Sequence, residues 1–292
     1  MTAMVRPESQ PPDPPGTPES SASPASVAEA QLAQRNLIAF NRALTRWGSR
    51  GSLEEGGGAV LCAGGSWIPV VANGAYRSDD GLEPALLLAR ADAFFGSLAR
   101  GFSVKVRSSG EDEDLRAACI EAGLDPFGEG TPEMICRAPL PAVPIPEGLS
   151  VRWVDDEDGV ADFVAVNAQA YGTYGMPPEV LGDLFDNTAQ LLPDDDAHIV
   201  VARRDGEPIA TAMTFETLGT ASLQWVGTVP TARAGGLGAL VTTLTTNLAF
   251  ERGATSCTLQ ASPMGAPLYR DLGYETIWHY AEYVRWPRPP AA

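Results

Sequence analysis

The chain has 292 residues, with 37 acidic and 20 basic side chains and a formal net charge of −17. This length is sufficient for two domains that each bury a core without metals or disulfides. Because nucleic acids and anionic membranes both need a basic protein face, the acidic balance argues against either as a partner. Lys105 is the only lysine, so an anion site has to use arginine, backbone amides or helix N-termini.

The cysteines and histidines predict neither a disulfide framework nor a metal site. The four cysteines are widely spaced without a CxxC pair, and the two histidines are too few for a metal centre. The N-terminus lacks a positive region followed by an apolar core, and no apolar run reaches membrane-spanning length. We therefore expect a cytoplasmic protein with reduced thiols and no metal.

The first half begins with a segment that is poor in core-forming residues. Residues 1–27 are rich in proline and serine, which predicts a disordered tail. Helical spacing starts near Ala28 and ends at Gly48. The following predicted strands are 59–63, 67–72, 102–107 and 133–137. The predicted helices between them are 83–99 and 111–121.

A proline-rich stretch, 139–148, predicts a linker to the second half. The strands expected after it are 149–154, 198–203, 209–215, 222–229, 256–261 and 280–286. The expected helices are 159–171, 178–185, 236–251 and 265–272.

This order of elements repeats that of the first half. Gly101 and Gly253 occupy matching places 152 residues apart, and Gly123 and Gly273 do so 150 residues apart. We interpret the pattern as a tandem duplication into domains 28–138 and 149–287. Two unrelated α+β domains with a similar order by chance remain the alternative.

The strongest local signal is a strand, a proline-containing turn, a glycine-rich bend and a helix within residues 223–253. Amides at the start of such a helix, together with the helix dipole, form a site for phosphate oxygens. The missing side chains at Gly235, Gly236 and Gly238 let an anion come close. The segment therefore predicts a phosphate-binding loop.

Two common nucleotide loops do not fit this segment. A Walker loop requires a lysine, which is absent here. A Rossmann fingerprint requires glycine or alanine where Val241 stands and an acidic residue near Ala261 and Ser262.

The segment instead resembles the GNAT N-acetyltransferases. RAGGLG at 233–238 is similar to the R/Q-x-x-G-x-G/A pyrophosphate loop of that family, and VGTVP before it resembles the end of the family's fourth strand. Downstream, YRDLGYE at 269–275 resembles the Y-x-x-L-G-F/Y turn after the fifth strand. The resemblance covers 149–286 well, and covers the first half only as a degenerate copy without the glycine loop. It implies an α+β fold of two GNAT-like domains, each a mostly antiparallel mixed sheet flanked by helices.

The resemblance also implies a reaction and a co-substrate. Acetyl-CoA would transfer its acetyl group by direct attack of an amine on a small molecule or peptide. The fourth strand would pair with the pantetheine arm, and the loop after it would hold the pyrophosphate. The implied cofactor-binding residues are Val226, Gly227, Thr228, Arg233, Ala234, Gly235, Gly236, Leu237 and Gly238.

Acyl transfer to an amine needs a neutral amine, donors for the oxyanion and a proton for the departing thiolate. Tyr269 matches the tyrosine that often serves as the acid in this family, although it could equally anchor a short helix to the sheet. Glu216 at a strand end is our candidate base, with a solvated carboxylate as the alternative. Many members of the family use only ordered water.

The acceptor pocket is expected in the aromatic loop between the first two helices of the second half. Tyr171, Tyr174 and Met176 lie there, with an ordinary aromatic hinge as the alternative. Ser262 would contact cofactor or substrate, or cap the following helix; capping is favoured.

The first half carries SDDGLEP before its helix, and these carboxylates would repel phosphate. We predict a non-catalytic structural partner that closes the acceptor side. The expected acceptor is a small-molecule amine, and a homodimer is compatible with the sequence. The alternatives are a mycothiol-synthase-like tandem enzyme, an aminoacyl-tRNA dependent transferase, which the acidic chain disfavours, and a non-catalytic acyl-CoA sensor or scaffold.

Overall fold

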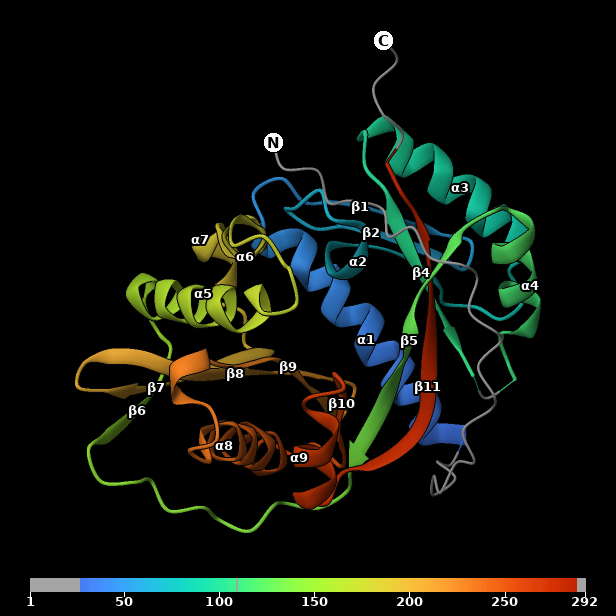
Figure 1. Cartoon of the computed structure of the whole chain (residues 1–292). Coiled ribbons are helices and arrows are strands. Elements are labelled where there is room, and N and C mark those ends of the chain that lie inside the picture. Colours follow the sequence, from blue (N-terminus) through green and yellow to red (C-terminus); the bar gives the residue numbers. More distant parts are fainter. Residues whose placement is uncertain (1–26, 109, 288–292) are drawn as a thin grey trace.

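The computed structural model describes residues 27–108 and 110–287, which form one eleven-stranded sheet covered by helices (Figure 1). The strand order is β1-β2-β3-β4-β11-β5-β10-β9-β8-β7-β6. The first-half elements are α1 (Val27–Trp47), β1 (Ser52–Gly56), β2 (Ala59–Ala63), α2 (Pro69–Ala72), β3 (Asn73–Arg77), α3 (Pro84–Ser97), β4 (Phe102–Arg107), α4 (Glu113–Glu121) and β5 (Asp125–Cys136).

The second half contributes the remaining elements. They are β6 (Leu149–Trp153), α5 (Glu157–Gly172), α6 (Glu179–Phe185), α7 (Thr188–Leu191), β7 (Ala197–Arg204), β8 (Glu207–Thr217), β9 (Thr220–Thr228), the 3-10 turn η1 (Pro230–Ala232), α8 (Leu237–Glu251), β10 (Cys257–Gln260), α9 (Ala266–Asp271) and β11 (Glu275–Arg285). In Figure 1, α1 and α5 lie on one face of the second-half strands and α8 on the other.

The predicted α+β class with mostly antiparallel mixed sheets is confirmed. Among the described strands only β3 with β4 and β9 with β10 pair in parallel. The predicted strands 59–63 and 102–107 have the observed bounds. The tail predicted for residues 1–27 falls outside the described residues except for Val27, which already belongs to α1.

The predicted strand 67–72 is wrong. Pro69 to Ala72 form the short turn α2, and β3 follows it. Pro69 has no N–H to donate to a sheet, and Val71 adopts a left-handed φ of 86°, so this apolar run cannot extend as a strand. β1 was missed because its SLEEG sequence is exposed and lacks apolar alternation.

The two halves exchange their last strands at the centre of the sheet. β5 of the first half pairs with β10 of the second, with Met134 opposite Leu259. β11 of the second half pairs with β4 of the first, with Glu282 opposite Lys105. β5 and β11 also pair with each other in antiparallel fashion. Each half of the sheet is therefore completed by a strand from the other half. The limits 28–138 and 149–287 divide the sequence, but they do not mark two separate sheets.

Helix α1 joins the two halves on one face of this sheet. Trp47 at its end is fully buried and stacks on Phe185 with ring centroids 6.2 Å apart, and it meets Phe215 edge-on at 5.9 Å. Leu37, earlier in the helix, belongs to a cluster with Tyr280 of β11. Burying such side chains stabilises the fold by about 1.5–3 kcal/mol each, so α1 couples the halves strongly.

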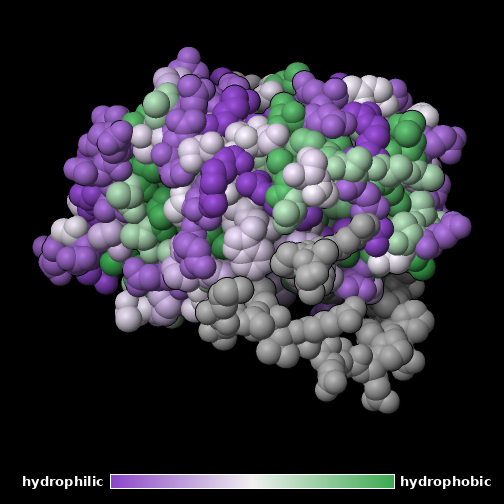
Figure 2. Space-filling model, turned by 90° about the horizontal axis from the view of Figure 1, so that it is seen from above, coloured by the Kyte–Doolittle hydropathy of each residue, from purple (hydrophilic) through white to green (hydrophobic). Residues whose placement is uncertain are grey.

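Much of the exterior is hydrophilic on the face shown in Figure 2. Hydrophilic residues are spread over the face seen in Figure 2, with smaller hydrophobic groups between them. Within the described residues, no helix combines the length and the apolar character that crossing a membrane requires.

The role of α1 can be tested by replacing two tryptophans. Trp47→Ala should lower the free energy of unfolding by about 3–5 kcal/mol, because a fully buried indole leaves a cavity. Trp67 is 45% exposed, and Trp67→Ala should change stability by less than about 1 kcal/mol. Urea unfolding of both variants gives the comparison; equal losses would contradict the coupling role of α1.

Candidate functional site

A cavity of about 1080 Å³ lies between the two halves of the chain. The first half contributes one wall, which includes Leu37, Ile68 and Thr131. The residues predicted from the sequence that line the cavity are Tyr171, Tyr174, Met176, Val226, Thr228, Arg233, Ala234, Gly236, Leu237, Gly238, Ser262 and Tyr269. The structure therefore brings most of the predicted site together.

The cavity opens where strands β9 and β10 separate. Their parallel pairing runs from Ala221 with Cys257 to Leu223 with Leu259 and then stops. On its other edge β9 stays paired with β8 as far as Thr228. The residues from 224 to 228 thus turn one edge of backbone N–H and C=O groups toward the gap without a strand partner. Such an edge can pair with an extended polar ligand.

A β-bulge interrupts β9 at this gap. The register with β8 shifts between Thr211 and Met213, and Trp225 opposite this point has a φ of 54°. A glycine inside an apolar strand, such as Gly227, indicates a bulge or a close approach of another segment. The bulge lies at Trp225 and Val226 instead. At Gly227 a side chain comes close, because a Cβ atom there would lie 2.5 Å from Oδ1 of Asn167.

The glycine loop leads into helix α8 without a side-chain cap. Gly236 occupies the N-cap position with a φ of 75°, which favours glycine, and Ala234 also has a positive φ of 64°. A Cβ atom at Gly236 would meet no atom within 4 Å, whereas one at Gly238 would lie 3.2 Å from Leu268. The first amides of α8 and the positive end of its dipole therefore border the cavity, which is an arrangement that suits a phosphate group.

Arg233 lines the cavity and also holds two elements together. Its Nη2 donates to the carbonyl oxygen of Ala170 and to Oγ1 of Thr173, both at 3.2 Å. Its Nε donates to the carbonyl oxygen of Thr228 at 3.4 Å. The guanidinium thus ties the end of α5 to the end of β9 beside the predicted phosphate loop.

The predicted acid, Tyr269, is buried in the wall of the cavity and packs edge-on against Tyr274 at 6.0 Å. Burial raises the pKa of Tyr269 above the usual 10, so its hydroxyl remains protonated through neutral pH. The side chain of Tyr269 therefore both packs against Tyr274 and lines the cavity.

The predicted acceptor residues form an aromatic wall next to the bulge. Tyr171 packs against Trp225 with ring centroids 5.4 Å apart, and Tyr174 lies 6.2 Å from Tyr171. The hydroxyl of Tyr174 shares a hydrogen bond of 3.2 Å with Oγ of Ser262. Ser262 Oγ also accepts from the amide of Gly265 in the turn before α9, whose N-cap residue is Gly265 itself.

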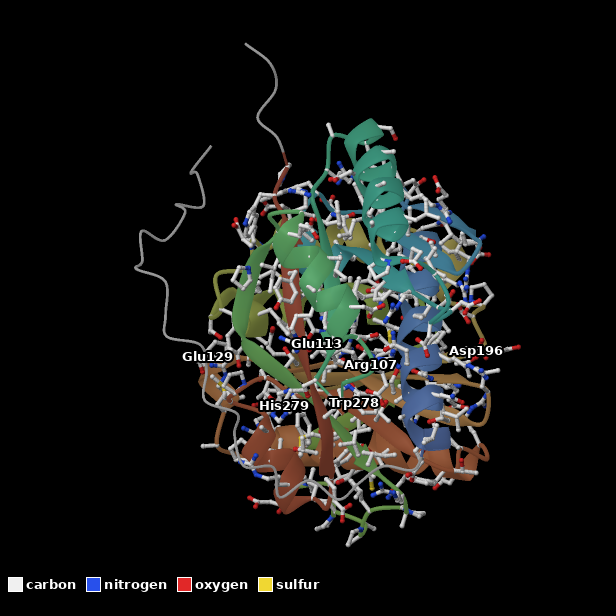
Figure 3. All side chains as sticks on the ribbon, turned by 90° about the vertical axis from the view of Figure 1, so that its right-hand side faces the viewer. Arg107, Glu113, Glu129, Asp196, Trp278 and His279 are labelled. Atoms are coloured by element: carbon white, nitrogen blue, oxygen red, sulfur yellow. The ribbon has the colours of Figure 1, made fainter. Side chains whose placement is uncertain are left out.

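The structure does not bring Glu216 to the cavity. Strand β8 runs antiparallel to β9, so Glu216 pairs with Ala221 at the start of β9, while the gap opens toward the other end of that strand. Both carboxylate oxygens accept from Arg252 Nε at 3.1 Å, and the Glu216 amide donates to Asp196. Figure 3 shows Asp196 on the opposite side of the molecule from Glu129, a cavity residue.

Sequence reasoning missed a charged cluster on the exchanged strands. Glu282 of β11 approaches Lys105 of β4 at 3.4 Å, and both line the cavity. Glu133 of β5 is buried, and burial raises its pKa to about 8 against smaller opposing contributions of Thr258, Gln260 and Lys105. The available signal was a charged residue within each predicted apolar strand. Only the strand exchange places Lys105 opposite Glu282, and it places Glu133 on the adjacent strand.

The corresponding place in the first half is filled by ion pairs. Arg77 at the end of β3 and Arg107 at the end of β4 both bind the buried Asp112, at 2.9 and 2.7 Å. Arg77 also binds Asp114 at 2.6 Å. In the described residues this half has no counterpart of the glycine loop, because α3 begins with Pro84 after Glu83.

Comparison with known proteins agrees with this geometry. Residues 146–265 match the family model described as acetyltransferase (GNAT) domain. No curated protein matches the chain.

Solved structures with the same architecture cover nearly the whole chain. A GCN5-related N-acetyltransferase from Kribbella flavida is 22% identical with a TM-score of 0.64 and covers 89% of this chain and 96% of its own. One from Sphaerobacter thermophilus is 18% identical with a TM-score of 0.58, covering 92% and 96%. A tandem GNAT protein from the clavulanic acid biosynthesis pathway is 14% identical with a TM-score of 0.57, covering 92% and 98%.

These findings define the class of the protein. The fold is that of the GNAT N-acetyltransferases, and the family model falls on the half that carries the glycine loop and most of the gap between β9 and β10. Residues 146–265 match a GNAT acetyltransferase domain, which indicates an acyltransferase activity for this part of the chain.

The buried carboxyl group of Glu133 predicts a pH dependence of stability. Its pKa is about 8 in the folded protein and near the usual 4.5 when unfolded, so the unfolded state loses this proton first. The contribution of Glu133 to stability is therefore full below about pH 4.5 and falls as pH rises to about 8. Glu133→Gln has no proton to lose and should gain stability relative to the native protein across this range.

Urea unfolding at pH 5, 6.5, 8 and 9 measures this difference. Glu129→Gln, at an exposed position of the same strand, is the control and should follow the native protein. A stability difference for Glu133→Gln that stays constant with pH would contradict the prediction.

Proposed function

We propose that this chain transfers an acetyl group from acetyl-CoA to an amine of a small-molecule acceptor by direct attack. The observation that carries the proposal is the end of β9–β10 pairing at Leu223 and Leu259, which opens a backbone edge into the same cavity as the uncapped start of α8. An extended polar arm ending in phosphates matches both features.

The residues present fit acetyl-CoA in two places. The amides from Ala234 to Gly238 would hold the pyrophosphate, and the positive φ values at Ala234 and Gly236 shape this loop as a concave set of N–H groups. The free edge of Val226, Gly227 and Thr228 would pair with the pantetheine amides. When bound, acetyl-CoA supplies an activated acyl carbonyl and a thiolate leaving group.

The chain's own groups would act at the point where the strands part. Backbone N–H groups at the bulge near Trp225 and Val226 can donate to the acyl oxygen as negative charge develops on it. Tyr269 keeps its proton at neutral pH and can give it to the departing sulfur. Since Glu216 is bound by Arg252 away from the cavity, ordered water would carry the proton from the attacking amine.

The direct test is calorimetric titration of the full-length protein with acetyl-CoA, followed by thiol-release assays with amine, aminoglycoside, amino-acid and peptide acceptors. We expect saturable binding and turnover with an amine. No binding of acetyl-CoA would overturn the proposal, and binding without turnover against the whole panel would favour an acyl-CoA sensor.

The phosphate loop can be tested at Gly235. Gly235→Asp should weaken CoA binding by about tenfold or more, because a carboxylate would face the pyrophosphate. Gly235→Ala is the matched control, since its Cβ atom would lie 3.4 Å from the carbonyl oxygen of Ala232 and adds no charge. Equal affinities of the two variants in calorimetry would argue against phosphate binding at this loop.

Tyr269→Phe should lower kcat by about a hundredfold and leave the affinity for CoA unchanged, because only proton donation is lost. Tyr274→Phe is the control: it removes a buried hydroxyl that bonds Thr246 at 2.7 Å and should cost about 1 kcal/mol of stability without a comparable loss of kcat. Unchanged kcat in Tyr269→Phe would remove this residue from the mechanism.

A further inference from the structure

The wall of the cavity opposite α8 contains buried polar atoms without partners. Among the described residues, Oε1 of Glu282, Oε2 of Glu133 and Nε2 of Gln260 are buried and make no hydrogen bond. Glu282 is 7% exposed and Glu133 is 3% exposed. A buried polar atom without a partner is unfavourable, and Glu282 lines the cavity, so its Oε1 is available to a ligand there.

The sheet register gathers these atoms on one face. Glu282 lies opposite Lys105, and Glu133 lies opposite Gln260 on the neighbouring strand pair. Side chains alternate along a strand, so Glu133 shares the face of Ile135, which packs with α1. Lys105, Gln260 and Glu282 also line the cavity, so the cluster belongs to its wall.

The charges of this wall favour a positive group. Lys105 is already engaged by Glu282 Oε2, which leaves Oε1 free to accept. Burial lowers the pKa of His279, so this cavity residue adds no positive charge at neutral pH. In Figure 3, Glu129 on β5 and His279 on β11 mark the two strands that form this wall. The free carboxylate oxygen of Glu282 is best matched by a group with several N–H donors, such as an ammonium.

Glu282 lies too far from the gap beside β9 for the positive group that it binds to be the attacking nitrogen itself. Strand β11 follows β10 and β5 in the sheet, three strand spacings or about 14 Å from β9. An amine that attacks in the gap beside β9 cannot touch Glu282 at the same time. A group held by Glu282 is therefore a second part of the acceptor.

We propose that Glu282, which is paired with Lys105, binds a second, protonated amino group of the acceptor, which makes diamines the acceptor class. The inference rests on the proposed acetyl transfer. It adds how the second amino group of the acceptor, the one that is not acetylated, is recognised. The first half and the exchanged strand β11 thereby determine which amine the second half acylates.

The test compares binding of α,ω-diaminoalkanes of four to seven carbons with amino alcohols of the same length. Calorimetry uses the full-length protein saturated with CoA, so that no turnover is needed. We expect at least one diamine to bind about tenfold more tightly than its amino alcohol, the difference that one charge-assisted contact gives. Equal affinities across the series would overturn the inference.

Two variants and one control assign the preference to this cluster. Glu282→Gln should abolish the preference for the diamine, while Glu121→Gln, at an exposed position of α4, should retain it. Lys105→Gln removes the competing cation and should increase the preference. A preference that survives in Glu282→Gln, or that does not increase in Lys105→Gln, would place the second amino group elsewhere.

The affinity for CoA and the unfolding midpoint of each variant show whether the fold is retained. Failure to bind CoA in the native protein would refute the proposed function. Intact CoA binding without a diamine preference would refute only this inference.

Discussion

The exchange of β5 and β11 is the constraint on which the rest of the structure depends. The backbone groups of a central strand have to be paired, and these two strands pair with each other and with β10 and β4. Removing either half would expose the edges of the other. The cavity lies over this junction, so its two walls come from halves that the sheet holds in one register.

The two halves contain the same parallel strand pair, but the ends of the two pairs differ. Each contains one parallel pair, β3 with β4 and β9 with β10. In the first half, Asp112 between Arg77 and Arg107 fills the end of the pair with internal ion pairs. In the second half, the glycine loop leaves the helix start and the strand edge open. This open helix start is where we propose that the anionic ligand binds, and the other half supplies a wall of the same cavity.

Burial controls the chemistry that this cavity can support. It keeps Tyr269 protonated, and it raises the pKa of Glu133 into the neutral range, where a nearby cation would favour ionisation. The folded protein tolerates a buried carboxyl group and several unpaired polar atoms in the same wall. Such costs are typical of functional sites, because a rigid core without a ligand would avoid them.

The sequence by itself determined the features that depend on neighbouring residues. The loop at 233–238, the start of α8 and the turn at Tyr269 follow from glycine conformation, helix spacing and a short motif, and strands β2 and β4 have the bounds that their apolar runs predicted. The tertiary structure alone decided which strand ends meet. Glu216 has the residue type of a base but lies at the end of β8 that is far from the cavity, whereas Lys105 and Glu282 became neighbours through pairing across the exchanged strands. Strand partners depend on contacts between distant segments, and no local pattern specifies them.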